Sequence, residues 1–581
     1  MSQLEAKVAQ IRTLVGEHKL EQARALTQRL AQSHPRDARV ATLAAMVMNQ
    51  CNLPAQALHY ATLAAKLLPH HPQPRLDLGR LHSIAGDHAR AEAAYREALA
   101  LAPLDHAPRA ALAALLFDRG RFHEALSLCM RNGGLDPGLA GVAAGCYLRL
   151  VRAGEASRAL ELLLSQSPDD VNALIGAALV LNYRDDVTPQ DSFAAHRRVG
   201  DWFARRHPPQ AVPYHPAPGP GEPVRVGILS PDLRQHSVSY FIEPLLRHHD
   251  PGAVRLTVYY TNRVEDHVTK RLKPLADAWR AADTLDDNRL AQAIFNDHTD
   301  VLVELSGLTH GHCLPVMQMH PAPVGVSYIG YPNTTGLSSI AARLVDSITD
   351  PPGPADALAT ERLVRLDPCF LCYAPPADAP EPAPRAPGAP LVLGSFNAAQ
   401  KITDSTIRLW TRATLAVPGS VLMLKSVNFE DAGLREDIRA RFASAGLENA
   451  RLLIVPPREG VLNHLAAYHE VDIALDPTPY NGTTTTCEAL WMGVPVVTLA
   501  GRVHAARVGA SLLSAAGLAD LVAPDEEAFV RAVAGLATDS ARRHALRASL
   551  RGTVRASPLC DGQAFARRFE KVMRVLASAP R

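Results

Sequence analysis

A 34-residue repeat constrains the fold of the first third of the chain. Three kinds of residue recur at this interval in one register: Pro35, Pro69, Pro103 and Pro137; Gly86, Gly120 and Gly154; Ala23, Ala57, Ala91, Ala125 and Ala159. Alanine lets two helices cross closely, and proline cannot continue a helix. Three columns in one register therefore predict an array of paired helices.

Residues 86–103 (GDHARAEAAYREALALAP) show one unit of this repeat in full. The period and pattern resemble the tetratricopeptide repeat, whose arrays present a concave surface to peptides or partner proteins. A dimerisation or spacer module is the alternative role, and a homodimer is a partner that it would allow. The register weakens after Gly154, and helical segments are expected to continue to residue 206.

Beyond a proline-rich stretch at residues 207–223, short apolar runs alternate with amphipathic helices. Strands are predicted at 224–230, 256–261, 301–305 and 324–330, and, after a second proline-rich stretch, at 391–397, 421–425, 452–455, 471–476 and 494–499. Two sets of alternating strands and helices predict two doubly wound parallel-sheet domains. Ligands in such folds sit at the carboxyl ends of strands, here in the cleft between the domains.

The predicted domains are consequently a helical repeat region with linking helices (1–206) and two Rossmann-like domains (224–374 and 391–581), the second with a terminal helix. Proline-rich linkers at 207–223 and 375–390 separate them. The fold class is α + α/β.

Composition excludes several classes of protein. The 581 residues are 47% apolar and 20% charged with a net charge of +2, which suits several compact units and argues against a nucleic-acid-binding protein. Eight scattered cysteines predict a reduced, cytoplasmic protein, and Cys369 and Cys372 are interpreted as strand residues rather than a metal or redox site. We find no secretory segment and no run long enough to span a membrane. The abundance of alanine, arginine and proline fits a GC-rich bacterial genome.

Residues 480–495 (YNGTTTTCEALWMGVP) predict an anion site. They follow the predicted strand 471–476: Asn481 and Gly482 supply a turn, Thr483 to Thr486 cap a helix, and Glu488 falls in its first turn. A helix start offers free N–H groups to a phosphate. The alternative is a plain helix cap, but four threonines are poor helix formers, which favours the anion site.

Three other strand ends carry candidate site residues. His236 is a candidate general base or positioning donor, or else a capping or core histidine. Lys401 could neutralise a leaving diphosphate, or be a surface lysine. Gly330, in the loop 329–336 (IGYPNTTG), could let the backbone approach a ligand, or form a simple β-turn.

Missing motifs narrow the chemistry further. The chain has no G-x-x-x-x-G-K-[ST], no G-x-G-x-x-G after a strand and no D-x-D, which disfavours a P-loop NTPase, a nicotinamide dehydrogenase and a metal-chelating glycosyltransferase. Cationic side chains and a helix terminus are then expected to do what a metal would do for a diphosphate.

Six motifs occur in order and resemble the O-GlcNAc transferase/SPINDLY family: 230–242 (SPDLRQHSVSYFI), 320–324 (HPAPV), 329–336 (IGYPNTTG), 394–402 (GSFNAAQKI), 481–488 (NGTTTTCE) and 501–505 (GRVHA). The resemblance covers nearly the whole chain, including the repeats. It implies a GT-B fold and metal-independent, inverting transfer from a nucleotide sugar to Ser or Thr of proteins, with no cofactor.

The resemblance also assigns roles by position. His236 matches the active-site histidine and Lys401 the diphosphate-binding lysine; donor contacts are implied for Gly330, Gln400, Lys401, His464, Thr483, Thr484, Thr485, Thr486 and Glu488. Of these, His464 would lie beside the base, and Glu488 would contact the sugar or ribose. Animal O-GlcNAc transferases have His at the position of Thr483 and Gln at that of Ala398.

The leading hypothesis is therefore a cytoplasmic protein O-glycosyltransferase that uses UDP-GlcNAc and binds its protein or peptide acceptor along the repeat groove. The threonine run and the segment HSVSYF (236–241) are more similar to SPINDLY, some of whose members use GDP-fucose, so GDP-fucose is the alternative donor. A non-catalytic repeat scaffold is the alternative of another class. The presence of Lys401, His236 and the threonines argues against a scaffold.

Overall fold

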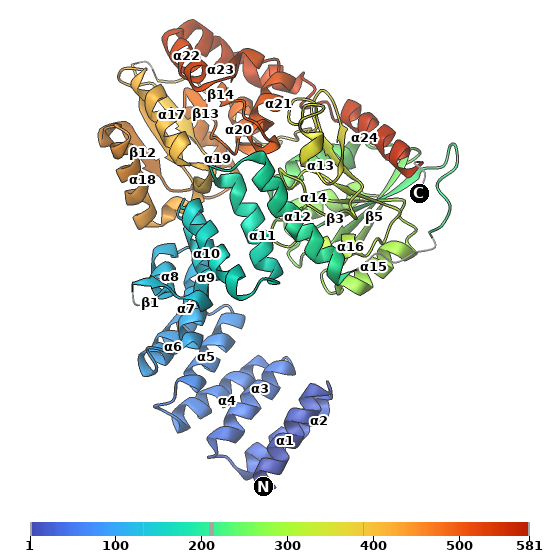
Figure 1. The fold of residues 1–581 in the computed structure, drawn as a ribbon, viewed down its shortest axis with the longest axis vertical. Coiled ribbons are helices and arrows are strands. Elements are labelled where there is room, and N and C mark those ends of the chain that lie inside the picture. The colour runs from blue at the N-terminus through green and yellow to red at the C-terminus, as the bar shows by residue number, and fades with distance from the viewer. Residues whose placement is uncertain (1–2, 132, 208–213, 387, 579–581) are drawn as a thin grey trace. The chain divides into compact units, whose positions relative to one another are not determined.

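The computed structural model describes residues 3–131, 133–207, 214–386 and 388–578 (Figure 1). The chain forms two compact units, Met1–Tyr147 and Leu148–Arg581, which are described separately. Residues 208–213 of the first predicted linker and residue 387 of the second lie outside the described residues. The predicted domain boundaries remain predictions, and the division after Tyr147 falls inside the range 1–206 predicted for the helical region.

The first unit is built from helical hairpins. Its helices are α1 (Gln3–Gly16), α2 (Leu20–Ser33), α3 (Ala38–Gln50), α4 (Pro54–Leu67), α5 (Pro72–Ile84), α6 (His88–Leu101), α7 (His106–Asp118) and α8 (Phe122–Cys129). The antiparallel strands β1 (Met130–Arg131) and β2 (Gly134–Leu135) follow, and α9 (Ala140–Arg149) reaches across the division. Ala23, Ala57, Ala91 and Ala125 are fully buried, as expected where helices cross.

A column of left-handed residues ends the first helix of each hairpin. His18, Asn52, Gly86 and Gly120 have φ angles of 57°, 56°, 75° and 74° and lie 34 residues apart. The next member of the predicted glycine column, Gly154, lies instead inside α10 (Ala153–Gln166), and Val151 takes the left-handed conformation with φ 61°. This shift of three residues explains why the sequence register weakens there.

Replacing Gly86 with alanine should weaken the repeat array without creating a clash. No atom lies within 4 Å of a Cβ at Gly86, so only the left-handed backbone opposes it, at about 1–2 kcal/mol. Hydrogen exchange of the α5 and α6 amides in the full chain would report this loss. Gly16→Ala, where φ is not positive and the surroundings are equally open, is the matched control. Equal protection in Gly86→Ala and the wild type would contradict the expectation.

The second unit begins with three helices and a seven-stranded parallel sheet. The helices are α10, α11 (Val171–Val180) and α12 (Pro189–Arg206). The strands are β3 (Val224–Ser230), β4 (Val254–Tyr260), β5 (Ala278–Ala281), β6 (Val301–Glu304), β7 (Val324–Ser327), β8 (Ala342–Val345) and β9 (Arg362–Arg365), in the order β5-β4-β3-β6-β7-β8-β9. In register, Val226 lies opposite both Leu256 and Val301. Helices α13 (Ser237–His248), α14 (His267–Leu272), α15 (Asp287–Asn296) and α16 (Leu314–Gln318) connect the strands.

A six-stranded parallel sheet forms the rest of this unit. Its strands are β10 (Val392–Ser395), β11 (Val421–Lys425), β12 (Leu452–Val455), β13 (Ile473–Leu475), β14 (Val496–Leu499) and β15 (Val522–Ala523), in the order β12-β11-β10-β13-β14-β15. Its helices are α17 (Asp404–Leu415), α18 (Ala432–Ser444), α19 (Val461–Ala466), α20 (Thr484–Trp491), α21 (Val508–Ala515), α22 (Glu526–Thr538) and α23 (Ser540–Arg555). Both sheets reverse their strand order beside the first strand, as in doubly wound folds.

Helix α12 packs closely against the loop that follows β7. A Cβ at Gly200 of α12 would overlap the Gly336 carbonyl, and a Cβ at Gly336 would overlap the carbonyl of His196. His196 Nδ1 lies 2.6 Å from the Ser192 carbonyl, so it donates, and Nε2 accepts from Tyr331 Oη at 2.7 Å. Burial lowers the pKa of His196 to about 4, which keeps this imidazole neutral.

The last helix, α24 (Gly562–Ala577), returns to the first sheet domain, where it packs on α13. Glu570 Oε1 accepts the N–H of Asp250 at 2.8 Å. The Tyr373 N–H donates to the Leu559 carbonyl at 2.7 Å, so the two segments that cross between the sheet domains lie side by side.

Several sequence expectations are corrected by the structure. The strand predicted at 324–330 ends at Ser327, because Ile329 is left-handed with φ 75°. Cys369 and Cys372 are buried but lie outside any strand. The strands β5, β8, β9 and β15 were not predicted. Among the described residues, we find no helix with the length and apolar character needed to cross a bilayer.

Candidate functional site

The site begins at the end of β13 with Asp476, which is 1% exposed. Its Oδ1 accepts the Gly482 N–H at 2.6 Å, and its Oδ2 accepts the Thr498 hydroxyl at 2.7 Å. Burial raises the pKa of Asp476 to about 6, although two hydrogen bonds and nearby Lys401 oppose the rise. The carboxylate fixes the turn that leads into α20.

The start of α20 carries unpaired N–H groups. The first backbone bond runs from the Cys487 N–H to the Thr483 carbonyl at 3.1 Å, and the described residues supply no acceptor for the N–H groups of Thr484, Thr485 and Thr486. Such groups, aided by the helix dipole, favour an anion. A Cβ at Gly482 would approach the Thr485 hydroxyl to 2.5 Å, so glycine is required there.

Two details differ from the sequence expectation. Thr483 stands at the N-cap position, but no side-chain hydrogen bond caps the helix. The Thr485 hydroxyl instead donates to Asn397 Oδ1 at 3.0 Å, which ties the helix start to the loop after β10. Because α20 begins at Thr484, Glu488 lies in its second turn rather than its first.

Lys401 and Gln400 stand beside this helix start. Lys401 Nζ donates to the Asn481 carbonyl at 2.7 Å and lies 3.9 Å from the centre of the Tyr480 ring. Burial lowers the pKa of Lys401 to about 8, with Asp476 opposing the fall. Gln400 Oε1 is buried and has no hydrogen-bond partner among the described residues. A cation and an unpaired amide oxygen beside the helix start suit a polar ligand.

His464 bridges two charged residues. Lys425 Nζ lies 2.5 Å from His464 Nδ1, and His464 Nε2 lies 3.0 Å from Glu488 Oε2. A lysine ammonium only donates, so Nδ1 accepts and Nε2 donates to Glu488. Lys425, which ends β11 and lies 4.4 Å from the centre of the Phe396 ring, is not among the site residues predicted from the sequence. Its position at a strand end beside the switch point could have identified it.

His236 begins α13 as its N-cap residue. Its Nδ1 accepts the Val238 N–H at 3.3 Å and lies 3.9 Å from Asp232 Oδ2, and its side chain is 40% exposed. Burial lowers the pKa of His236, with Asp232 opposing. Since Nδ1 accepts, the neutral ring carries its proton on Nε2 and presents a donor rather than a base.

Gly330 makes a close approach, but to the protein itself. A Cβ at this position would overlap the Leu305 carbonyl at the end of β6. Its loop is further tied down because Glu361 accepts hydrogen bonds from Thr334 and from Thr335. The glycine therefore has a packing reason, and its predicted donor contact remains a prediction.

The structure brings most of the predicted residues together. Just before α20, Asp476 accepts a hydrogen bond from Gly482, and Lys401 donates one to Asn481. His464 of α19 contacts Glu488 in the second turn of α20. His236 belongs to the other sheet domain. Burial and, next, the Glu488 carboxylate raise the pKa of Tyr240, which lies on the helix α13 that His236 caps, to about 12.

Two parallel sheets of this topology, preceded by helical repeats, define a GT-B architecture. The profile of glycosyl transferase family 41 matches residues 207–372 and 384–569, and the chain belongs to that family. The structure of a mutant O-GlcNAc transferase from Thermobaculum terrenum superposes with a TM-score of 0.74 at 30% identity, over 93% of this chain and 97% of that one.

Curated plant relatives are similar in sequence. A probable UDP-N-acetylglucosamine–peptide N-acetylglucosaminyltransferase SPINDLY from Arabidopsis thaliana is 40% identical over 417 residues, covering 70% of this chain and 45% of that protein. The probable transferase SEC of the same plant is 26% identical over 360 residues, covering 60% of this chain and 36% of that protein. The chain thus spans about half the length of the SPINDLY relatives that it matches.

Proposed function

We propose that the chain is an inverting, metal-independent protein O-glycosyltransferase that transfers GlcNAc from UDP-GlcNAc to Ser or Thr of proteins. The observation that carries this proposal is the row of unpaired N–H groups at Thr484–Thr486 with Lys401 in front of it. A nucleotide diphosphate is the anion that this cradle suits. The names of the O-GlcNAc transferase and SPINDLY relatives support the sugar and the acceptor, and eight free cysteines support a cytoplasmic location.

The proposed reaction is a direct displacement. An acceptor hydroxyl oxygen attacks the anomeric carbon of the sugar, the bond from that carbon to the β-phosphate oxygen breaks, and the nucleoside diphosphate leaves with the electron pair. The hydroxyl proton passes to a diphosphate oxygen. Lys401 and the three N–H groups stabilise the charge that grows on the leaving group, which is where electrostatic help lowers the barrier most.

His236 is proposed to position substrates rather than to act as the general base. Its Nδ1 is engaged with the Val238 N–H, and the lowered pKa keeps the ring neutral near pH 7. The N–H on Nε2 can donate to a donor sugar or an acceptor but cannot take a proton.

GDP-fucose is the second candidate donor, because identity to SPINDLY is 40% whereas identity to SEC is 26%. Calorimetric titration of the full chain with UDP and with GDP decides between them. We expect tighter UDP binding and GlcNAc transfer that persists in excess EDTA. Preferential GDP binding would select the fucosyl reaction. Binding of neither nucleotide would favour a scaffold, and activity restored only by Mg²⁺ or Mn²⁺ would reject the metal-independent mechanism.

Lys401→Ala should abolish most transfer while leaving the fold intact. Loss of this cation removes stabilisation of the leaving diphosphate, on the order of 10²–10³-fold in rate. Steady-state turnover and circular dichroism test both parts. Turnover near the wild-type value would remove Lys401 from the mechanism.

The pKa of Lys401 gives this test a second readout. Near pH 8, about half of the free protein has a neutral Lys401, and a bound diphosphate would recharge it. Nucleotide affinity should therefore fall as pH rises through about 8, and binding at pH 8 should take up protons. Lys425, whose pKa burial also lowers to about 8, adds to the uptake, so Lys401→Ala should reduce it rather than remove it.

His236→Asn and His236→Ala separate the roles of this residue. Asparagine can still cap α13, whereas alanine cannot. If His236 positions substrates, both variants should lose activity by less than the roughly 10²–10⁴-fold expected of a missing base, with His236→Ala losing more because it also loses the cap, and the pH–rate profile should keep its shape. Loss of one limb of that profile, with turnover undetectable in both variants, would establish the base instead.

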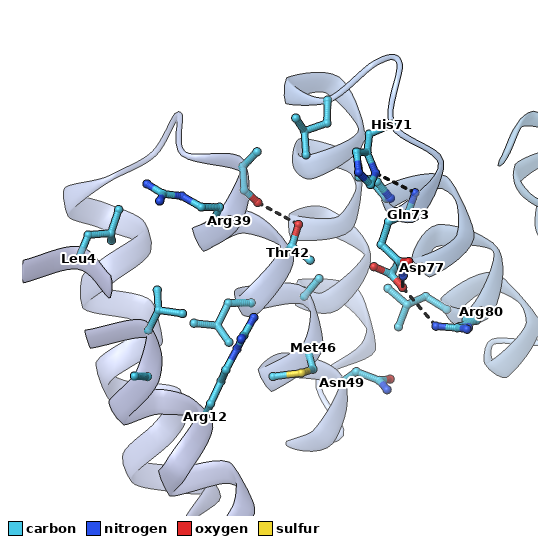
Figure 2. Close-up of a pocket in the computed structure, with 18 of the residues that line it drawn as sticks. Leu4, Arg12, Arg39, Thr42, Met46, Asn49, His71, Gln73, Asp77 and Arg80 are labelled. Atoms are coloured by element: carbon cyan, nitrogen blue, oxygen red, sulfur yellow. Dashed lines mark hydrogen bonds and ion pairs between the residues drawn. The ribbon is translucent and has the colours of Figure 1, made fainter. Parts of the chain in front are cut away.

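The repeat groove is proposed to bind the protein acceptor. A cavity of about 1090 Å³ opens in the first unit between α1, α3 and α5. Figure 2 shows Met46 and Asn49 of α3 beside it, with Arg12, Arg39 and Arg80 around it. Exposed apolar side chains amid polar ones suit an extended peptide.

Glutamate at Ile84 and Met46 should reduce transfer to protein acceptors several-fold and leave nucleotide binding unchanged. These side chains are 70% and 39% exposed and line the cavity, so the fold tolerates the change while the apolar contact is lost. The control is Leu104→Glu, which alters a side chain that is 74% exposed outside this lining. Equal protein glycosylation by all variants would remove the groove from acceptor binding.

A further inference from the structure

A second cavity, distinct from the helix start of α20, lies within the second compact unit. It measures about 250 Å³ and is lined by segments of both sheet domains and of α12. Its ionisable lining residues are Arg343, Asp350, Arg502, His504 and Arg507. The lining therefore holds three guanidinium groups and one carboxylate, because His504 is neutral.

The carboxylate of Asp350 is already engaged. His504 Nδ1 lies 2.5 Å from Asp350 Oδ2, an inter-domain hydrogen bond between buried groups. Burial would raise the pKa of Asp350, but His504 and Arg343 lower it overall, so the group is charged. Burial lowers the pKa of His504, which then donates from Nδ1 as a neutral ring.

Arg343 is left without a hydrogen-bond acceptor. Its side chain is 6% exposed, and the nearest carboxylate contact, Nη1 to Asp350 Oδ1, measures 3.7 Å. No residue in the described ranges accepts a hydrogen bond from its guanidinium group. A buried guanidinium has five donors and a high cost of desolvation, so a cavity in front of it calls for an acceptor of opposite charge.

Arg507 and Arg502 add two more positive charges to the lining of the cavity. Arg507 is held by the carbonyls of Ile348, at 2.6 Å, and Gly501, at 3.0 Å, through Nε and Nη1. Arg502 is exposed at the mouth of the cavity. Pro189, Pro351 and Pro354, whose rings fix their φ angles, also line the cavity.

We propose that this cavity binds a small oxyanion of two or more negative charges, of the phosphate type. Arginine presents the planar donors that recognise phosphate and carboxylate groups. The volume lies below the roughly 300–1,000 Å³ of sites for drug-sized ligands, which favours a compact anion. Bound there, the anion bridges the two sheet domains through Arg343 on one side and Arg502 and Arg507 on the other. This inference does not depend on the proposed function.

Titration of the full chain with inorganic phosphate, at constant ionic strength, tests the proposal. Phosphate can also bind at the start of α20, so Lys401→Ala separates the two sites. We expect saturable binding that survives in Lys401→Ala but weakens on the order of 10- to 100-fold in Arg343→Gln and Arg502→Gln. Arg531→Gln, an exposed arginine on α22, is the matched control and should bind as the wild type does.

Two results would overturn the proposal: no saturable phosphate binding by the wild type, or binding that Lys401→Ala abolishes and Arg502→Gln leaves unchanged. Arg502 is exposed, so its variant keeps the test decisive even if Arg343→Gln fails to fold.

Discussion

The buried carboxylate of Asp476 holds three parts of the second sheet domain together: the turn at Gly482, the hydroxyl of Thr498 on β14, and, through its charge, Lys401. Because its pKa is raised to about 6, the native state binds this proton more tightly than the unfolded chain does, and stability falls as pH rises from about 4 to about 6. At neutral pH the fold therefore carries a costly charge. Its hydrogen bonds from Gly482 and Thr498 offset part of that cost, and they order the turn that precedes the three unpaired N–H groups.

The same arrangement shows why the anion site could be foreseen from the sequence but its details could not. The order of strand, Asn-Gly turn and threonine run is local, so it predicts a helix start with free N–H groups. The partners are not local: the Thr485 hydroxyl reaches Asn397, 88 residues earlier, and His464 meets Lys425, 39 residues earlier. Lys425 is the last residue of an apolar strand, so the sequence alone indicates a strand residue there and not a site residue. Only the parallel pairing of β10, β11 and β13 brings these positions to one edge.

The strands, too, could be predicted where the local sequence pattern is strong and not where it is weak. The predicted strands 224–230, 421–425 and 452–455 match β3, β11 and β12, because apolar runs bounded by turns define them. The edge strands β5 and β9 contain arginines and only four residues each, so their sequences carry little periodicity. Gly330 could, from the sequence, let the backbone approach a ligand or form a simple β-turn; the structure gives it a neighbour from its own chain, the Leu305 carbonyl, and its donor contact stays a prediction. A glycine signals close approach without saying what approaches.

The crossing of Tyr373 and Leu559 limits how the two sheet domains can separate. The chain passes between them near residue 374 and again before α24, and the Tyr373 N–H bonds to the Leu559 carbonyl where the passages meet. Two tethers pinned at one place permit rotation about that place but oppose sliding or full detachment. A rotation of this kind would have to break two hydrogen bonds between the sheet domains, His504–Asp350 and Ser511–Asp346, each 2.5 Å long. Neither hydrogen bond belongs to a strand pairing, so both sheets could stay intact in such a rotation.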